Sequence, residues 1–270
     1  MEELTFSTVD RKIIPIENSY KDSSCFLVFG GPGLNNMKMS LLKQPGIISL
    51  GVNNSVKAFR PNLWTCVDDP EKFMYSIWKD PTIQKIVPFH KGGKRLFNNY
   101  LWQKTDEVVQ NCPNVVYYHR NEHFQPEIYL SEKTVNWGNH KKFGGSRSVM
   151  LAAIKIAYLL GFRKVFLCGC TFKMENNTNN YAWKQNRTNS SVNGNNSTYR
   201  ALTERFKILR PIFEQNDFYV FNCTPDSHLK VFPQIDLEDA VKMALNGFPD
   251  VQNENVEGMY ERVKDEKDKK

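Results

Sequence analysis

A helix that leads into a buried strand through a very short link is the feature that most narrows the fold of this chain. Apolar residues recur at helical spacing from Val149 to Leu160, and soon after Gly161 the chain continues as the apolar run "KVFLCGC". A short, continuous apolar run is typical of a strand that is covered on both faces, as in parallel sheets. The two elements therefore predict one αβ unit of a parallel sheet.

The same alternation of strand and helix extends over most of the 270 residues. Strands are expected within residues 25–29, 46–56, 62–69, 82–90, 114–121, 164–170 and 218–233. Helices are expected within residues 34–44, 70–80, 149–160, 198–217 and 236–247. This order predicts an α/β fold with a Rossmann-like, mostly parallel sheet flanked by helices. Residues 91–112 interrupt the order, and a lid or a peripheral helix is expected there.

The domain organisation is expected to be simple. A single domain is expected over residues 1–250, followed by a charged tail at 251–270. Within the domain, residues 173–198 form a polar, Asn-rich stretch that is too long for an ordinary connection in a compact domain. Two interpretations of this stretch stay open, a functional lid and a disordered loop.

Composition and charge indicate the cellular compartment and the kind of partner that this chain would have. No run of about 18 apolar residues occurs, which predicts no membrane span. The mixed-charge N-terminus lacks the pattern of a secretion signal, and six cysteines without a CxxC pair are typical of reduced thiols. A cytoplasmic protein is therefore expected. The net charge of +7 favours anionic partners such as nucleotide phosphates or nucleic acid.

The first expected strand runs into "FGGPGLNN", which holds Gly30, Gly31, Pro32 and Gly33. Glycines let a phosphate or a ribose approach the backbone, and the N-terminus of the helix expected next offers free N–H groups to an anion. A plain tight turn is the simpler alternative. Because the loop ends the first strand of an α/β pattern, we interpret it as a phosphate-binding loop.

Polar pairs end the next two expected strands. Asn53 and Asn54 offer the donors and acceptors that base or ribose recognition needs, although an Asx-turn would also use them. Asp68 and Asp69 are candidates for metal ligands or for a general base that takes a proton from an acceptor hydroxyl. The simpler interpretation is that Asp69 caps the helix that opens at Pro70.

The most strongly patterned helix begins at "GGSRS". Gly145, Ser146, Arg147 and Ser148 would place backbone N–H groups, two hydroxyls and a guanidinium around a diphosphate. No Glu or Gln follows either serine at the spacing of a capping box. This absence favours the binding interpretation over a purely structural one.

The carboxyl ends of parallel strands meet at one edge of the sheet, so the polar strand ends should converge there. The polar stretch would add Tyr181, whose phenol could close over phosphates together with the cations Lys184 and Arg187. The five histidines show no metal-ligand spacing, so no metal site is predicted. The binding residues expected at this edge are Gly30, Gly31, Pro32, Gly33, Asn53, Asn54, Gly145, Ser146, Arg147, Ser148, Thr171 and Thr224.

The order of these motifs resembles two related groups of proteins. The matching segments are "GGPGL", "GVN", "DDP", "GGSRS…LAAIKIAYLLGFRKVFLCGCTF", "NNYAW" and "NSTYRALTERF…FYVFNCTPDSHL", within residues 24–235. One group is the bacterial sialyltransferases of lipo-oligosaccharide synthesis, which use a CMP-sugar donor. The other is the hydroxymethylpterin diphosphokinase-like proteins, which share a Rossmann-like core.

The resemblance implies roles for individual residues. Gly31, Pro32 and Gly33 would approach the donor nucleotide, and Asn53 would lie near its ribose or phosphate. Asp69 matches a polar strand-end position that faces the donor in the sialyltransferases.

The resemblance also covers the later motifs, with one departure. Ser146 and Ser148 match the region that touches the base and the ribose, and Tyr181 matches a lid tyrosine that stabilises the departing phosphate. The lid histidine that serves as general base in the sialyltransferases is missing from "SSVNGNN" at 190–196, and Lys173 stands in place of their second lid tyrosine. Another group must therefore deprotonate the acceptor, or the reaction is not sialyl transfer.

We expect a glycosyltransferase that moves a sugar from a CMP- or UDP-sugar donor to a hydroxyl acceptor, with Asp69, Asp68 and Tyr181 as catalytic residues. The acceptor would be a glycan or a nucleic acid, for example a hydroxymethylated base in DNA. Two alternatives stay open, an ATP-dependent diphosphokinase of the hydroxymethylpterin type and a non-catalytic nucleotide-binding module. The transferase requires no cofactor, although the paired acids are compatible with Mg²⁺.

Overall fold

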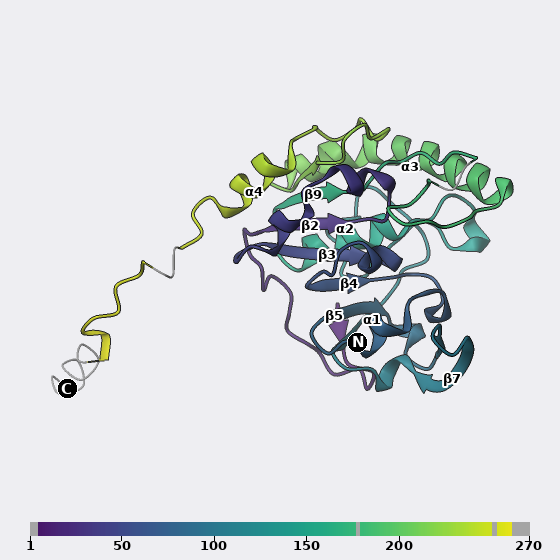
Figure 1. Cartoon of the computed structure of the whole chain (residues 1–270), viewed down its shortest axis with the longest axis horizontal. Coiled ribbons are helices and arrows are strands. Elements are labelled where there is room, and N and C mark those ends of the chain that lie inside the picture. The colour runs from purple at the N-terminus through teal and green to yellow at the C-terminus, as the bar shows by residue number, and fades with distance from the viewer. Residues whose placement is uncertain (1–4, 177–178, 250–252, 261–270) are drawn as a thin grey trace.

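The computed structural model describes residues 5–176, 179–249 and 253–260. Its main element is an eight-stranded sheet in the order β1-β8-β5-β4-β3-β2-β9-β10 (Figure 1). The strands are β1 (Phe6–Ser7), β2 (Ser24–Val28), β3 (Ile48–Val52), β4 (Leu63–Thr65), β5 (Gln84–Pro88), β8 (Val115–Tyr118), β9 (Lys164–Cys168) and β10 (Tyr219–Asn222). Only β1 runs antiparallel to its neighbour, so the predicted mostly parallel α/β sheet is confirmed.

The order of strands reverses at β2. The chain runs outward from β2 through β3, β4, β5 and β8, and then crosses back to add β9 and β10 on the other side of β2. Strand β9 therefore pairs with β2 in register, Cys25 opposite Val165 and Val28 opposite Cys168. In open α/β sheets the crevice at such a reversal, outside the carboxyl ends of the strands, is where ligands bind.

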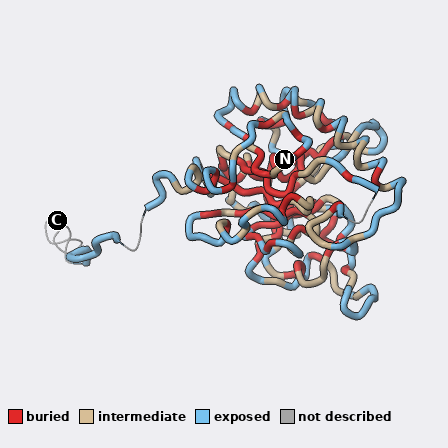
Figure 2. The backbone as a smooth tube through the Cα atoms, turned by 45° about the horizontal axis from the view of Figure 1, so that its top comes forward, coloured by how far each residue is buried: buried red, intermediate tan, exposed pale blue. Residues whose placement is uncertain are grey.

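Helices cover both faces of the sheet. One face carries α2 (Val149–Leu159) and α3 (Asn189–Gln215), and the other carries α4 (Leu237–Leu245) and α1 (Tyr75–Lys79). Alternate residues of β2 face opposite sides, Leu27 towards α2 and Phe26 towards α4, as the pleat of a strand requires. Figure 2 shows the buried residues gathered in the sheet and on the inner side of the helices.

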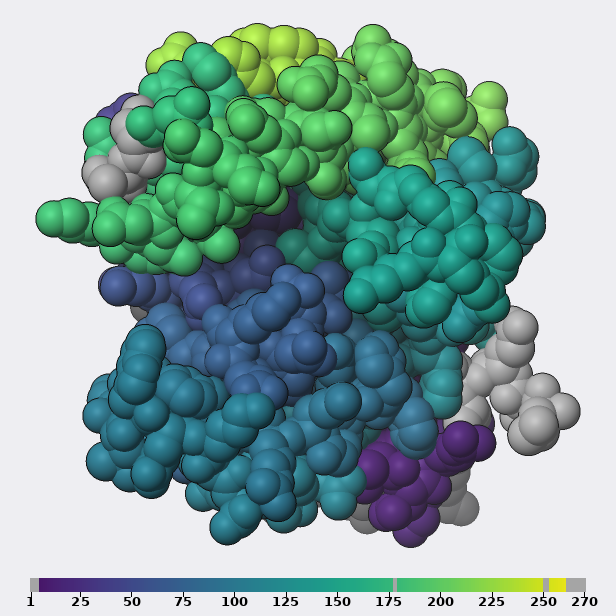
Figure 3. All heavy atoms as spheres, turned by 90° about the vertical axis from the view of Figure 1, so that its right-hand side faces the viewer, coloured from purple at the N-terminus to yellow at the C-terminus, as the bar shows by residue number. Residues whose placement is uncertain are grey.

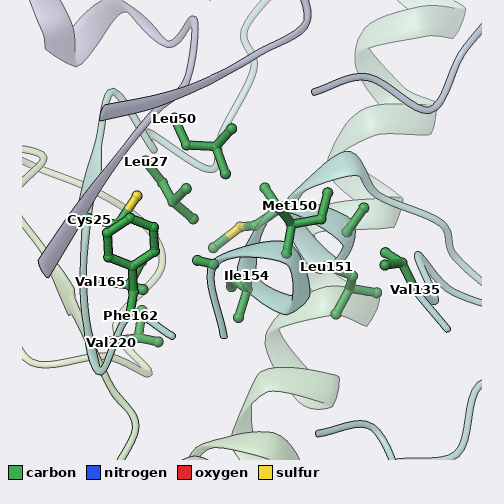
Figure 4. Close-up of a cluster of buried hydrophobic side chains, with 14 of the residues drawn as sticks. Cys25, Leu27, Leu50, Val135, Met150, Leu151, Ile154, Phe162, Val165 and Val220 are labelled. Atoms are coloured by element: carbon green, nitrogen blue, oxygen red, sulfur yellow. The ribbon is translucent and has the colours of Figure 1, made fainter. Parts of the chain in front are cut away.

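The core between α2 and the sheet is closely packed. Leu27 and Leu50 from the strands lie opposite Met150 and Ile154 of α2 (Figure 4), and none of the four is more than 2% exposed. The same helix also buries Lys155, whose ammonium group donates to the carbonyl oxygens of Leu130 and Glu132. Burial lowers the pKa of Lys155 to about 8. Lys155 therefore holds residues 130–132 against α2.

Residues 91–112 differ from the expectation of a lid or a peripheral helix. They contain a hairpin of β6 (Arg95–Asn98) and β7 (Gln103–Val108). The side chain of Asn98 accepts hydrogen bonds from the N–H groups of Tyr100 and Leu101, which stabilises the turn. The aromatic residues of this stretch suit a strand better than a helix, and the asparagine marks the turn.

The Asn-rich stretch also differs from the expectation. Helix α3 begins at Asn189, so residues 189–198, expected as part of the lid, are helical. The hydroxyl of Thr188 caps the helix by accepting from the N–H of Ser191 at 3.2 Å. Asn196 holds the backbone of Met174 through two hydrogen bonds of 2.8 Å, one as acceptor and one as donor. These capping and tertiary bonds outweigh the low helix propensity of asparagine.

The structure also bears on the expectations about membrane spans and cysteines. No helix within the described residues is long and apolar enough to cross a membrane. All six cysteines are buried and free. Most of the charged tail expected at 251–270 lies outside the described residues. Only its residues 253–260 are described.

Candidate functional site at the carboxyl edge of the sheet

The carboxyl ends of the parallel strands open into a hollow of the molecular surface. Figure 3 looks onto this edge, and the surface is hollowed between the segments of residues 120–147 (teal), 179–200 (green) and 55–100 (blue). We call this the central hollow. Strands β2, β9 and β10 end on one side of it, which we call the glycine side, and β4, β5 and β8 end on the other, the charged side.

On the glycine side the loop after β2 closes tightly against the ends of β9 and β10. The N–H of Gly31 donates to the carbonyl oxygen of Gly169 at 2.9 Å, and the N–H of Gly33 donates to Oγ1 of Thr171 at 3.3 Å. A Cβ atom on Gly31 would lie 2.3 Å from the oxygen of Gly169, and one on Gly33 would lie 2.6 Å from the methyl group of Thr224. Close packing between loops therefore requires both glycines, a reason that the sequence does not reveal.

The helix expected after the glycine loop is only a 3-10 turn at Pro32–Asn36. Its first N–H groups are not free, because Pro32 has none, that of Gly33 binds Thr171, and that of Leu34 binds the carbonyl oxygen of Gly31. The expectation that a helix N-terminus binds an anion at this loop is therefore wrong.

A second segment covers the glycine loop. We call residues 179–188 the covering segment. The N–H of Ala182 donates to the carbonyl oxygen of Gly30 at 2.9 Å, and a Cβ atom on Gly30 would lie 2.7 Å from the ring of Trp183. The rings of Tyr181 and Trp183 stack with their centroids 5.2 Å apart. Tyr181 thus lies beside the glycine loop, and Trp183, which the sequence reasoning missed, lies on top of it.

Tyr181 is supported by a cation from the same segment. Arg187 donates to the phenol oxygen from Nε at 3.0 Å and from Nη2 at 2.6 Å. Its guanidinium also lies 5.2 Å from the centroid of the Tyr181 ring. The phenol oxygen therefore accepts twice, and among the described residues its own proton has no acceptor.

The two asparagines after β3 have different roles. Asn54 donates to the carbonyl oxygen of Lys72 and accepts from the N–H of Met74, both at 3.0 Å, so it holds the chain after β4 in place. Asn53 has a left-handed backbone with φ of 52°, and its carbonyl oxygen accepts from the indole of Trp64. Its side-chain Oδ1 is buried without a hydrogen-bond partner among the described residues. Of the two asparagines, only Asn53 has a buried side-chain atom left without a partner among the described residues.

On the charged side both acids are paired with lysines. Asp69 binds Nζ of Lys91 at 2.7 Å, and this hydrogen bond and charge lower the pKa of Asp69. Asp68 lies 3.5 Å from Lys72. Asp69 stands at the position of a helix cap before Pro70 but makes no capping bond with its side chain. Capping, the simpler interpretation, is therefore wrong for Asp69, and its partner Lys91 was not anticipated.

Two histidines follow strands of the charged side, and His90 lies next to the Asp69–Lys91 pair. His90 follows β5, stacks on Trp137 with centroids 6.4 Å apart, and has a pKa that is lowered by partial burial and by the charges of Lys91 and Arg120. His119 follows β8, and its Nε2 is buried without a partner in the described part of the chain. His90 is therefore a neutral imidazole at neutral pH and can accept a proton.

The "GGSRS" stretch is used partly for structure. Ser148 caps α2 by accepting from the N–H of Met150 at 3.1 Å, a plain cap that needs no capping box. The carbonyl oxygen of Ser146 accepts from Arg205 at 2.8 Å. Gly145 and Arg147 are exposed, and Arg147 pairs with Gly138 through the backbone.

The structure brings the predicted residues into two groups rather than one. Gly30, Gly31, Gly33, Thr171, Thr224 and Tyr181 meet on the glycine side. The end of β5 lies three strand spacings from that of β2, about 14 Å at the usual spacing in a sheet. The Asp69–Lys91 pair therefore belongs to the other end of the site. No group of three or more His, Cys, Asp or Glu residues suited to a metal ion occurs among the described residues.

Another groove lies against α3. It has a volume of about 670 Å³ and is lined by Lys207, Arg210 and Glu214 of α3 and by His228 and Lys230. Its two α3 cations are already paired with acids of the same helix. The central hollow is the better candidate because its polar groups converge from separate strands and include two buried atoms without a partner among the described residues, Oδ1 of Asn53 and Nε2 of His119.

Comparison of the sequence and the structure with protein-family models, curated proteins and solved structures gives no match.

Proposed function

We propose that this chain is a glycosyltransferase that takes a sugar from a CMP- or UDP-sugar donor and binds that donor on the glycine side of the central hollow. The observation that carries the proposal is the covering segment, which lies on the glycine loop at the reversal of strand order. There it presents the phenol of Tyr181 and the guanidinium of Arg187. This position is where open α/β sheets bind nucleotides.

The Tyr181–Arg187 pair suits a departing nucleotide phosphate. When the bond between sugar and phosphate breaks, negative charge develops on the phosphate oxygen. The free phenol proton of Tyr181 can be donated to that oxygen, and the guanidinium behind it offsets the charge. Pre-arranged donors of this kind favour the transition state because they need no reorganisation during the reaction.

Asn53 suits a hydroxyl of the donor. A buried acceptor without a partner costs about 1–3 kcal/mol, and a left-handed backbone at a residue other than glycine adds further strain. A ribose hydroxyl that donates to Oδ1 would remove the first cost. Asn53 ends β3, directly beside β2, so it is within reach of a nucleotide on the glycine loop.

Donor binding requires the covering segment to act as a lid. Trp183 occupies the space over Gly30, so a nucleotide reaches the glycine loop only when the segment lifts. Closure over the bound donor would then bring Tyr181 to the phosphate and exclude water from the reacting bond.

The general base on the charged side is best assigned to His90. Asp69 is held ionised by Lys91, and a carboxylate with a lowered pKa is a weak base. Partial burial and nearby positive charges lower the pKa of His90, so it is neutral at neutral pH, and it lies next to this pair. It would take the proton of the acceptor hydroxyl, while Asp69 compensates the charge of Lys91.

The diphosphokinase alternative requires acids that are free to hold Mg²⁺ against ATP. Asp68 and Asp69 are instead paired with Lys72 and Lys91, so nothing specific in the structure favours that activity. A thermal-shift panel of CMP, UDP, ATP and CMP- and UDP-sugars, with and without Mg²⁺, tests the proposal. We expect CMP or UDP and its sugar to raise Tm by several degrees at saturation, since ligand at about 100 times Kd adds about 2.7 kcal/mol.

A matched pair of variants makes this test specific. Arg187→Gln removes the cation behind Tyr181, whereas Arg200→Gln changes an exposed arginine early in α3. We expect only Arg187→Gln to reduce the shift given by a nucleotide sugar. Stabilisation by none of the compounds would refute the donor site, and Mg²⁺-dependent release of AMP from ATP would establish the diphosphokinase instead.

A further inference from the structure

Three arginines from distant parts of the chain meet around Gly138. Nη2 of Arg120, after β8, donates to the carbonyl oxygen of Gly138 at 2.8 Å. Arg147, just before α2, pairs with Gly138 through the backbone. Nη1 of Arg205, on α3, donates to the carbonyl oxygen of Ser146 at 2.8 Å and would lie 3.0 Å from a Cβ atom on Gly138. We call these three residues the arginine cluster.

Aromatic rings hold two of the guanidinium groups in place. The guanidinium carbon of Arg120 lies 3.8 Å from the centroid of the Trp137 ring, and that of Arg205 lies 4.2 Å from the centroid of the Phe124 ring. Stacked arginines keep their N–H donors in a fixed plane, so less freedom is lost when they bind an oxyanion. The cluster is therefore preorganised.

The positive charge of the cluster has no acid to balance it. None of the three arginines forms an ion pair with a carboxylate in the described residues. Glu122, the acid whose charge acts on Arg120, is itself paired with Lys142. Burial and the charge of Arg147 lower the pKa of Arg120, and burial lowers that of Arg205. Two of the three guanidinium groups, those of Arg120 and Arg205, are partly buried. Like charges without a counter-ion are costly there, and a bound anion removes that cost.

The cluster is separate from the glycine side. The atoms nearest to Gly30, Gly31 and Gly33 belong to residues 169–171, 181–183 and 224–225, none of which is a cluster arginine. Arg120 follows β8, whose end lies four strand spacings from that of β2, about 19 Å. The segments of residues 120–147 and 179–200 form opposite walls of the central hollow (Figure 3). A ligand on the cluster and a nucleotide under the covering segment would thus face the same space.

We infer that the arginine cluster binds a phosphate or carboxylate group carried by the acceptor, so that the acceptor of this transferase is an anionic molecule. That the bound molecule is the acceptor rests on the proposed function; the anion site itself does not. Arg147, which the sequence assigns to the donor phosphates, belongs to the acceptor in this proposal. His90 and Arg120 lie against the same ring, Trp137, so an anion on the cluster would bring a neighbouring hydroxyl to the base.

Isothermal titration of the full chain with inorganic phosphate at low salt tests the site, with Arg147→Gln, Arg205→Gln and the control Arg200→Gln. Arg147 and Arg200 are both exposed, so their replacement should leave folding intact, which Tm checks. We expect each cluster variant to weaken phosphate binding about tenfold or more, the usual effect of losing a charged hydrogen bond, and the control to match the native chain.

A repeat titration with saturating CMP or UDP identifies which substrate the site serves. Phosphate binding that is unchanged by the nucleotide supports an acceptor site, and competition overturns that assignment in favour of the donor phosphates. Failure of the native chain to bind phosphate, or equal binding by all variants, refutes the anion site. Stabilisation by a nucleotide in the same samples would leave the proposed function standing in that case.

Discussion

The glycine side and the charged side of the central hollow are held together by different forces. On the glycine side, backbone groups bond to each other and small residues permit contacts such as that of Gly31 with Gly169. On the charged side, long side chains hold the segments together through the Asp69–Lys91 ion pair and through the groups stacked on Trp137. Packing contacts tolerate almost no added volume, whereas partly exposed ion pairs tolerate substitution but respond to pH.

The difference suggests a division of labour. Under the proposed function, the glycine side would recognise and release a nucleotide, and the charged side would bind and deprotonate a second molecule. A change on the charged side should therefore alter the reaction rate, and a change on the glycine side should alter stability or nucleotide affinity.

The largest effect is expected from His90→Gln. If His90 is the base, the transfer rate should fall about 100-fold or more with little change in nucleotide affinity. Because the pKa of His90 is lowered, the native rate should hold at neutral pH and decline only in acid, as the imidazole becomes protonated. Steady-state rates across pH measure both effects, with His123→Gln as control. An unchanged rate in His90→Gln, or a loss of the same size in Asp69→Asn but not in His90→Gln, would show that Asp69 is the base.

Gly31→Ala should give the next largest effect, on stability. Its Cβ atom would lie 2.3 Å from a backbone oxygen that cannot move aside easily, and we expect a loss of about 1–3 kcal/mol. Gly93→Ala is the matched control, because a Cβ atom there would meet nothing within 4 Å. Chemical denaturation measures both variants. Equal stability of the two would show that the loop after β2 is not tightly packed.

Asp69→Asn should have a smaller effect that depends on pH. The lowered pKa of Asp69 means that its ion pair stabilises the fold above the ordinary range of aspartate and that this contribution is lost as the pH falls through the lowered pKa. Because Asp69 is half exposed, we expect about 1 kcal/mol at pH 7 and no difference from the native chain in strong acid. Urea midpoints at several pH values measure this. A constant difference across pH would contradict it.

The smallest effect is expected from Trp183→Ala. Removing the ring that covers Gly30 should favour the lifted state of the covering segment, which increases nucleotide affinity about threefold. Arg187 still donates to the phenol of Tyr181 in this variant, so the transfer rate at saturation should change less than the affinity. Calorimetric titration with the nucleotide that gives the largest thermal shift measures the change. Weaker binding would mean that Trp183 contacts the nucleotide itself.

The sequence predicted which strand ends meet at the site better than it predicted the side chains that pair there. The convergence of Gly31 and Gly33 with Thr171 and Thr224 follows from two general rules, that apolar runs form parallel strands and that their carboxyl ends meet. Those rules use only local pattern and chain order. They succeed because the glycine side is built from strand ends.

The partners that change the chemistry were not predictable in this way. Lys91 lies 22 residues from Asp69, and Arg205 lies 59 residues from Ser146. Neither has a local pattern that marks it, because its role depends on tertiary contacts alone. The helical start of α3 was missed for the same reason, since Asn196 is held in place by Met174 rather than by helix propensity.

The reversal of strand order at β2 also determines when the site can form during synthesis. The strands β4, β5 and β8 of the charged side lie between residues 63 and 118, whereas β2 pairs with β9 across a separation of 140 residues, as between Cys25 and Val165. Contacts so distant in sequence form late and make folding slow. The glycine loop therefore emerges from the ribosome early but stays without its partners until Thr224 has been made, whereas Asp69 and Lys91 can pair much sooner.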